Sequence, residues 1–495
     1  MNARYWQMLT MRGPELPTRP TFDSRGRKYE ECVLTPQRIS GYDGIGQRFE
    51  YGVEAGKPAN PLPAIFDEDE RERIDLDRIA GTEIWLTIDL ERIGVVDGKY
   101  RLTWSSGAGV RHINGIIGNA RVLGDEGPNT VYEFIVHPSF WLATLQENSR
   151  FFKGSIADIL HEVIRPYGQI EWRINPDYYP QRDYIRQAWE SDWNFFMRLC
   201  EEWGYVVWIE HREQSHVLVI ADNPHAYRKH ERAYETLRYH AGGGHINEEP
   251  ITAMTYASAV TPGRVTVQDH SHSAPRLVPY ATPFRETYDK PRKTANADHE
   301  IYTHADFAQP ATRRDAPYDE TNWREEARHF ARVKLESRTS VGSRASAKGA
   351  LRGVEVGKTL SVTHYLYHAA NCEYLVLSCD MDIRATGTLS STERVYDISA
   401  SFVMQPLRER YRMPQVTPRP VIGGQEYAVI IGPDHAEMCV DKYNRALVQF
   451  IWDRDGKYDG KSAIWVRLAT AWHGMAMAWE RSTMRDAGNR CWSTT

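Results

Sequence analysis

Three short β-like segments near the C-terminal end constrain the fold of this chain most. Each is rich in Val, Ile and aromatic residues and is bounded by Gly, Pro, Asp or Asn, which is typical of strands between tight turns. In the second segment Val448, Phe450 and Trp452 alternate with a mixed set, so one face is fully apolar. Short antiparallel strands at this spacing favour a small barrel of the OB type. The segments are residues 427–431, 446–452 and 463–469.

The polar connection after the second segment, DRDGKYDG, carries three carboxylates, Asp453, Asp455 and Asp459. A calcium-binding EF-hand loop needs Gly at its sixth position, and here that position holds Tyr458. Glycines at two tight points fit a turn instead. We therefore predict that these carboxylates shape a turn and do not bind calcium.

The middle of the chain predicts two helices and a hairpin. Ser155 and Asp158 have the form of a capping box, and apolar residues follow at helical spacing until Pro166 ends the pattern. Ser191 is placed to cap a second helix, and Gly204 stands where a C-terminal glycine cap belongs. Core packing explains both helices without a cofactor. The hairpin strands expected next are residues 205–210 and 216–221.

Two parts of the sequence resemble one known family. PRPVIGG, DKYNRALVQFIWDRDGKYDG and WVRLATAW are similar, in order and spacing, to the start of the OB-fold in VgrG proteins. SRFFKGSIADILHEVI, ESDWNFFMRLCEEWGYVVWIEH and HVLVIADNPHAY are similar to the segment between the two hub barrels of that family. VgrG proteins are the spike tips of type VI secretion systems and are related to the hub and spike of contractile phage tails.

The resemblance implies a mainly β fold with α+β insertions, and composition, with 495 residues, favours several domains. A polar, Pro-rich stretch opens the chain and is expected to be partly loose. The predicted divisions are a first hub β-barrel at 31–150, a mixed α/β middle domain at 151–249, a second hub β-barrel at 250–405 with a helix at 321–336, a linker at 406–420, a partial OB-fold at 421–472 and a divergent tail at 473–495.

Composition places the chain among soluble globular proteins. Its net charge of −5 gives no general attraction to nucleic acid or to anionic membranes. None of the six cysteines forms a C-x-x-C pair, so free thiols in a reducing compartment are expected. Residues 1–20 lack the apolar core of a signal peptide, and no run approaches the length of a spanning helix. We expect synthesis in the cytoplasm, export without a cleaved signal and no stable membrane insertion.

The search for chemistry yields no catalytic, cofactor-binding or metal-binding residue. His161 and Glu162 begin like a zinc-protease helix, but no second His follows at the required position. His299 and His304 are five residues apart, which turns them away from a shared helix face. No G-x-S-x-G, Walker A or G-x-G-x-x-G sequence is found. We therefore predict a protein that is not an enzyme and carries no cofactor.

A short basic and aromatic stretch allows two interpretations. Arg408, Arg410, Tyr411 and Arg412 interleave in the way that single-stranded nucleic-acid sites do. The patch is short and the chain as a whole is acidic. We favour a solvated linker that packs between subunits and predict no nucleic-acid partner.

The VgrG resemblance implies a structural function. VgrG-like proteins form homotrimers, and two barrels per chain give six around the axis, matching the hexameric rings of the inner tube protein Hcp. Effectors or their adaptors are the further partners implied. The alternatives are a hub of a phage or contractile-bacteriocin tail, and a cell-wall hydrolase associated with a tail spike. The neighbouring genes would distinguish a phage or bacteriocin hub from a type VI spike. Peptidoglycan hydrolysis by the purified protein would support the cell-wall hydrolase.

After Trp472 the family likeness ends. The residues HGMAMAWERSTMRDAGNRCWSTT lack the Pro-x-x-Gly-x-Glu-Val and Gly-Asp-Pro-x-x-Pro segments that lead into the VgrG needle. A frameshift, an early stop or a natural short form would each explain a truncated copy. From this departure we expect impaired piercing and no binding of the PAAR-repeat cap that sits on the needle.

Overall fold

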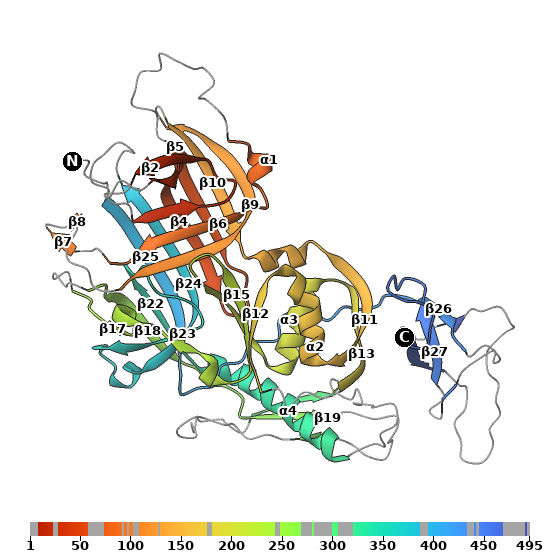
Figure 1. Cartoon of the computed structure of the whole chain (residues 1–495). Helices are drawn as coiled ribbons and strands as arrows, with labels where there is room; N and C mark the ends of the chain where they lie inside the picture. Colours follow the sequence, from red (N-terminus) through yellow and green to blue (C-terminus); the bar gives the residue numbers. More distant parts are fainter. Residues whose placement is uncertain are drawn as a thin grey trace, which may run out of the picture.

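The computed structural model has the mainly β fold with inserted helices that the sequence predicts (Figure 1). In space, a helix-containing middle region lies beside a large curled sheet, and a small C-terminal sheet lies on the far side of the middle region. The structure describes residues 8–22, 28–57, 74–91, 94–96, 99–101, 108–126, 129–175, 181–242, 248–268, 280–281, 299–304, 320–386, 395–432, 440–441, 445–468 and 491–492.

The curled sheet contains thirteen strands among the described residues. Its first half, in spatial order, is β1 (Leu9–Arg12), β6 (Glu83–Asp89), β9 (Val110–Glu126), β10 (Asn129–His137), β5 (Glu50–Lys57) and β4 (Thr35–Gly44). Its second half is β24 (Glu373–Thr386), β25 (Val395–Pro406), β22 (Ser343–Gly349) and β18 (Ile251–Ser258), with β16 (Arg228–Lys229), β17 (Thr236–Arg238) and β23 (Lys358–Thr363) attached through β24. We call these the first and second half-sheets.

The two half-sheets are joined by backbone hydrogen bonds. β4 runs antiparallel to β24, from Gly44 opposite Ser378 to Arg38 opposite Arg384. The segments predicted as two hub barrels therefore share one continuous sheet at this junction. Whether each half closes as a barrel of its own stays a prediction.

The first half-sheet begins earlier than the predicted start at residue 31. β1 pairs antiparallel with β6, and Leu9 and Met11 alternate with exposed neighbours so that both enter the core. This strand was not predicted from the sequence. Its four residues give too little alternation to detect, and the residues around it are polar and rich in Pro. Part of the segment expected to be loose is therefore a strand.

The middle region, residues 147–227, has the two helices and the hairpin that the sequence predicts. α2 (Ile156–Ile164) begins at the capping box of Ser155 and Asp158, and α3 (Asp192–Trp203) begins at Ser191 and ends at Gly204 in the left-handed conformation. Its strands are β11 (Glu147–Ser155) paired with β13 (Gln181–Ser191), and β12 (Gln169–Arg173) beside the hairpin of β15 (His216–Ala221) and β14 (Val206–His211). The predicted apolar face of α3 is buried: Trp193, Phe196, Leu199, Cys200 and Trp203.

The predicted helix at 321–336 is α4 (Glu320–Thr339), which runs below the middle region in Figure 1. Ala327, Phe330, Ala331, Val333 and Leu335 are buried along one side, as the amphipathic pattern requires. Beside α4 lies a small sheet of β19 (Arg264–Gln268), β20 (Tyr280–Ala281) and β21 (Glu300–His304).

The small C-terminal sheet contains the three predicted strands. They are β26 (Tyr427–Ile430), β27 (Arg445–Phe450) and β28 (Ile464–Arg467), and β29 (Cys491–Trp492) adds a fourth antiparallel strand beside β26. Apart from residues 491–492, the tail predicted at 473–495 lies outside the described residues. Completion of an OB barrel therefore stays a prediction.

The remaining elements are short. They are β2 (Thr18–Phe22), β3 (Lys28–Cys32), β7 (Gly94–Val96), β8 (Lys99–Arg101), α1 (Leu76–Ile79) and the 3-10 turns η2 (Ser139–Thr144), η3 (Arg165–Tyr167), η5 (Pro224–Ala226), η6 (Arg232–Tyr234), η7 (Ser340–Gly342) and η8 (His368–Ala370). Over the described part of the chain, no helix combines the length and apolar character needed to cross a membrane. Cys32, Cys200, Cys372 and Cys379 are free thiols, as predicted.

Replacing Gly204 tests how closely the end of α3 packs on α4. Its φ of +76° disfavours any residue with a Cβ, and an added Cβ would lie 2.6 Å from Val333 Cγ2. We expect Gly204→Ala to lower the free energy of unfolding by about 2–4 kcal/mol, combining backbone strain with overpacking. Urea denaturation measures this change.

Gly81→Ala is the matched control. Gly81 also has a positive φ of +84°, but no atom lies within 4 Å of its added Cβ. Gly81→Ala should therefore lower the free energy of unfolding only by the backbone strain, about 1–2 kcal/mol. Equal losses for the two variants would contradict the close packing of Gly204 against Val333.

Candidate assembly site at the middle region

The residues that the sequence analysis weighed for chemistry are not gathered into a reactive centre. His161 lies on α2, where its Nδ1 accepts a hydrogen bond from Trp172 Nε1 at 3.3 Å. His299 immediately precedes β21 and His304 ends it. Within the ranges that the structure describes, no group of three or more His, Cys, Asp or Glu side chains is arranged to hold a metal ion.

The carboxylates of the DRDGKYDG segment shape a turn, as predicted. Asp453 accepts from the backbone N–H of Asp455 at 3.2 Å. Asp459 accepts from the backbone N–H of Ser462 at 2.7 Å and from its hydroxyl at 2.8 Å. These bonds hold the pKa of Asp459 below its ordinary value, with the backbone of Ser462 as the largest cause.

Residues 406–422, here named the strap, connect the second half-sheet to the C-terminal sheet. The strap lacks helix and strand after β25, as a linker should, but its first part is not solvated. Arg412 and Met413 are each 3% exposed, and Ser337 on α4 donates its hydroxyl to the Met413 carbonyl at 3.0 Å. The prediction of a solvated linker is therefore wrong here, because the strap is packed against α4 within the same chain.

The arginines of the strap are used inside the chain. Arg412 Nε lies 2.7 Å from Glu336 Oε2 and Arg410 Nη1 lies 3.2 Å from Glu336 Oε1, while Arg408 donates to Tyr256 at 2.9 Å. Burial alone would raise the pKa of Glu336, but Arg412 and Arg410 together hold it below its ordinary value. These side chains fasten the strap and are not arranged as a row for phosphates.

The end of α3 holds the next part of the strap. The backbone N–H groups of Val416 and Thr417 both donate to Glu201 Oε2 at 2.9 Å, and the Thr417 hydroxyl donates to Oε1 at 2.7 Å. Glu201 is only 3% exposed, so three hydrogen bonds satisfy a buried carboxylate. The strap is thus fixed to α3 as well as to α4.

The C-terminal sheet packs on the outer face of β11 and β13 (Figure 1). We call this contact the seam. Its apolar half is an aromatic stack in which Phe151 lies 5.6 Å from Phe450 and 5.4 Å from Trp452, measured between ring centroids. The smaller residues Ala428, Ala446, Val448 and Ile464 complete the buried cluster. The apolar face predicted for 446–452 is the face that makes this contact.

The polar half of the seam is centred on Arg186. Its guanidinium makes two hydrogen bonds of 2.6 Å to Glu426 and lies 4.2 Å from the Trp452 ring centroid. Both charged side chains are largely covered, at 14% and 13% exposure. Lys153 donates to the Ala463 carbonyl at 3.0 Å, adding a second attachment. A two-pronged Arg–Glu pair fixes orientation as well as distance.

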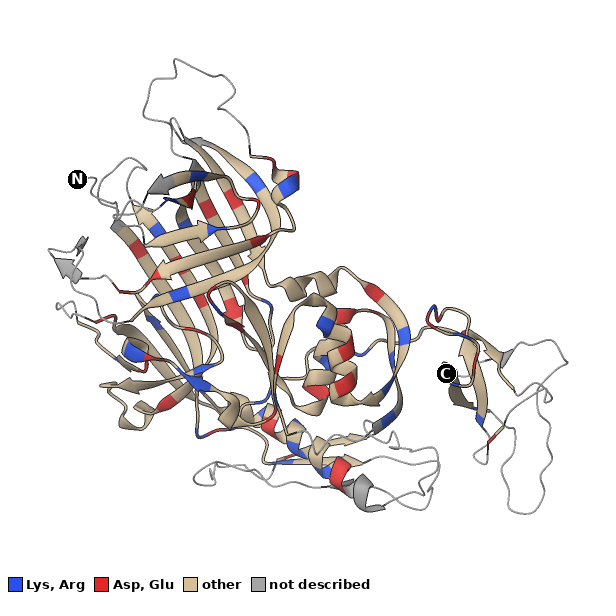
Figure 2. Ribbon diagram, in the orientation of Figure 1, with Lys and Arg blue, Asp and Glu red and all other residues tan. Residues whose placement is uncertain are grey.

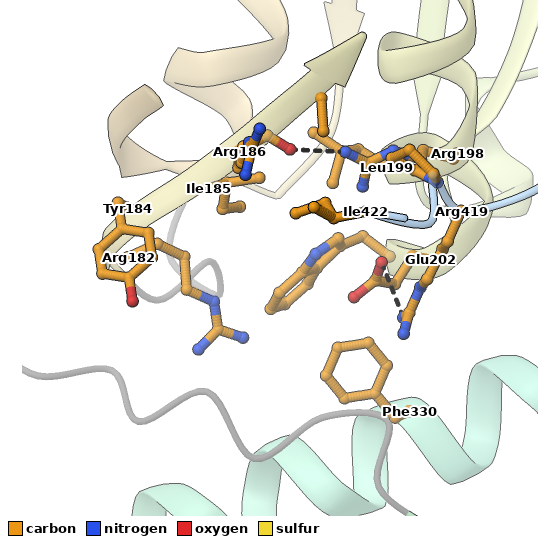
Figure 3. A pocket seen from close by; sticks show the side chains of 13 residues that line it. Arg182, Tyr184, Ile185, Arg186, Arg198, Leu199, Glu202, Phe330, Arg419 and Ile422 are labelled. Carbon is orange, nitrogen blue, oxygen red and sulfur yellow. Dashed lines mark hydrogen bonds and ion pairs between the residues drawn. The ribbon is translucent and has the colours of Figure 1, made fainter. Parts of the chain in front are cut away.

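A pocket of about 250 Å³ lies where strap, α3, β13 and α4 meet (Figure 3). Ile422 from the strap points into it beside Leu199, while Trp203 and Phe330 belong to the same wall. Arg419 of the strap pairs with Glu202 at 3.1 Å, and Arg198 pairs with Glu190 at 2.7 Å. The arginine charges at this pocket are matched by carboxylates, so the pocket is a packing junction and not an anion site.

Sequence reasoning missed the residues of the seam and strap. No local sequence signal marks Arg186, Glu201 or Glu426. The hydrogen-bonding partners of these side chains across the seam and along the strap lie 215 to 240 positions away in the chain. Trp452 was placed correctly on an apolar face, but its partner was not foreseeable. The charges are also interleaved in sign over the body, as Figure 2 shows, so no patch marks these positions.

A curled sheet, a mixed α/β middle region and a C-terminal sheet held by the seam and the strap make up a mainly β fold. The family comparison agrees with this class. The chain belongs to the phage tail baseplate hub (GPD) family, whose model matches residues 43–387.

Curated relatives confirm the VgrG resemblance. The chain is 25% identical over 459 residues to the type VI secretion system spike protein VgrG1c of Pseudomonas aeruginosa, and 25% identical over 458 residues to VgrG1a of the same organism. Each match covers 89% of this chain. The chain spans only 55% and 62% of the lengths of these relatives.

Solved structures share the fold. One is the E. coli c3393 protein, a type VI secretion component described as similar to the T4 bacteriophage tail proteins gp27 and gp5, with a TM-score of 0.58 and 13% identity over 92% of this chain and 93% of that one. Another is the lidded Francisella PdpA–VgrG complex, with a TM-score of 0.55 and 8% identity over 93% and 66%.

Arg186→Ala tests the seam. The substitution leaves Glu426 buried without its partner and removes the contact with Trp452, a loss of about 3 kcal/mol for a covered pair. The C-terminal sheet should detach locally, so backbone hydrogen exchange in β26 and β27 should accelerate about a hundredfold, as measured by mass spectrometry.

Arg19→Ala is the control for this prediction, because its pair with Glu31 is exposed at 57% and 39%. Its effect should be close to zero. Arg186→Met combined with Glu426→Met should recover part of the lost protection, since no unpaired charge remains. Unchanged exchange in Arg186→Ala would contradict the role assigned to the seam.

Proposed function

We propose that this chain is a structural hub and spike-tip component of a contractile type VI secretion apparatus. The observation that carries the proposal is the similarity to type VI spike proteins across 89% of the chain. The likeness of fold to a solved type VI component over nearly the whole chain supports it. The chain acts by its shape, as a rigid body that transmits force.

The assembled form is a homotrimer that docks on the hexameric ring of an Hcp-like tube protein. One half-sheet pair per chain, taken three times, offers six related faces to six subunits. Rigidity is the physical requirement, and it is supported within each chain by the continuous β4–β24 pairing and by the fastening of the strap to α3 and α4. Large, apolar interfaces are expected between the three copies.

Effectors or their adaptors are the cargo of this assembly. A Francisella VgrG has been solved in complex with PdpA, which gives a structural precedent for a protein bound to this fold. The producing cell makes the chain in its cytoplasm, and the apparatus exports it without a cleaved signal. The chain has no catalytic step of its own in this scheme.

A second candidate is the hub of a phage or contractile-bacteriocin tail. The observation that favours it is the family model itself, which describes phage tail baseplate hubs. The architecture is the same and the machine differs. Sheath ATPase and membrane-complex genes beside this one favour secretion, whereas tail-fibre and capsid genes favour a phage.

The direct experiment mixes the purified chain with the tube protein encoded in the same gene cluster. Mass photometry should show a complex of three chains on one hexamer. A tube protein from an unrelated cluster is the control and should bind more weakly. Absence of a complex, or release of soluble fragments from peptidoglycan by the purified chain, would contradict the proposal.

A further inference from the structure

The tip of the β14–β15 hairpin is attached to the first half-sheet by a compact set of hydrogen bonds. His211 and His216 face each other across the tip. Asn114 of β9, which is 1% exposed, donates its side-chain amide to the carbonyls of Arg212 and Ser215, the latter at 2.7 Å. This contact links the middle region to the curled sheet, and we call it the latch.

Both histidines of the latch accept hydrogen bonds from backbone N–H groups of the sheet side. Asn114 N–H donates to His211 Nδ1 at 3.1 Å. Ser139 at the start of η2 donates its N–H to His216 Nε2 at 3.0 Å, and its hydroxyl lies 2.9 Å from the same nitrogen. An accepting ring nitrogen carries no proton, so each ring is neutral with its proton on the other nitrogen.

The surroundings disfavour a charged ring. Phe49 packs on His211 at 4.9 Å between centroids, and Phe140 packs edge-on against His216 at 6.0 Å. Burial lowers the pKa of His216 to about 4. Burial first, then His216, also holds the pKa of His211 well below its ordinary value.

The charged groups that face the latch come from several elements. Arg111 and His112 of β9 and Lys358 of β23 lower the pKa of His211 further. The carboxylates Asp43 of β4 and Glu355 act on Arg111 and raise its pKa. The neighbouring groups that act on His211 all disfavour its charged form.

We propose that the latch is released by acid: each of His211 and His216 takes up one proton from solvent, its accepting nitrogen becomes an N–H donor facing another N–H donor, and the hairpin tip separates from β9 and η2. The protons remain on the rings, and no other bond is made or broken. The result is a hairpin tip that has separated from the sheet, while the apolar core that joins the middle region to the sheet stays packed.

The stability of the closed latch depends on pH because both rings are neutral in it. A released histidine has an ordinary pKa near 6.5, so the closed latch is fully stable above that pH and weakens as pH falls through the window from about 6.5 to about 4. Protonation of His216 then weakens the closed form about tenfold per pH unit, or about a hundredfold by pH 4.5, and His211 acts in the same direction.

The donors themselves report the latch. Hydrogen exchange of the Asn114 and Ser139 amides in the full chain, divided by the intrinsic rate at each pH, gives their protection. We expect this protection to fall at least about a hundredfold between pH 7.5 and pH 4.5. Constant protection across that range overturns the proposal.

His211→Asn combined with His216→Gln separates the latch from other titrating groups. The Asn Oδ1 takes the place of Nδ1 and the Gln Oε1 takes the place of Nε2, so both acceptors remain but neither titrates. The fall in protection should be lost in this variant and retained in the exposed control His368→Gln. An equal fall in the double variant overturns the proposal.

Asn114→Ala tests the latch by a second route, which does not depend on whether the double histidine variant folds. It removes the two bonds to the tip carbonyls but keeps the backbone donor. Protection of the Ser139 amide should then drop at least tenfold already at pH 7.5. An unchanged value would show that the hairpin tip is not held as a unit, and would also overturn the proposal.

Discussion

The antiparallel pairing of β4 with β24 is the interaction on which the rest of the structure depends. It joins strands that lie far apart in the sequence, and it makes one curled sheet of two half-sheets. The middle region contacts the first half-sheet at the latch, and the C-terminal sheet is held in turn by the middle region through the seam. A body that must pass on a mechanical load gains from such a joint, because a ladder of backbone bonds resists shear where side-chain contacts alone would slide.

Charge pairs between arginine and glutamate provide the second level of order. Glu336 fastens the strap through Arg412, and Arg186 fixes the C-terminal sheet through Glu426. Both pairs are covered, so salt screens them little, and each is accompanied by apolar packing. Such pairs add direction to a contact, and at the seam the aromatic rings around Phe151 add apolar packing beside it.

Local signals in the sequence predicted local structure. The capping residues Ser155 and Ser191, the glycine at Gly204 and the strand-forming residues of 446–452 each act within a few neighbours, and the two caps, the glycine and the strand were confirmed. The alternation of 446–452 is not seen in burial, because residues 446–450 are all buried. Long-range pairing left no comparable signal. The continuity of the sheet, the burial of the strap and the seam depend on partners far apart in the chain, and the strap's Pro and Arg content pointed to solvent. The absence of a catalytic cluster was an expectation, and the residues of the seam and strap were found only in the structure.

We propose that this chain works as a threefold body without chemistry of its own. Light scattering of the purified chain after size exclusion tests that claim most directly. We predict a native mass of about 171 kDa, three times the 57.0 kDa of one chain. A stable mass near that of a single chain at micromolar concentration would contradict it.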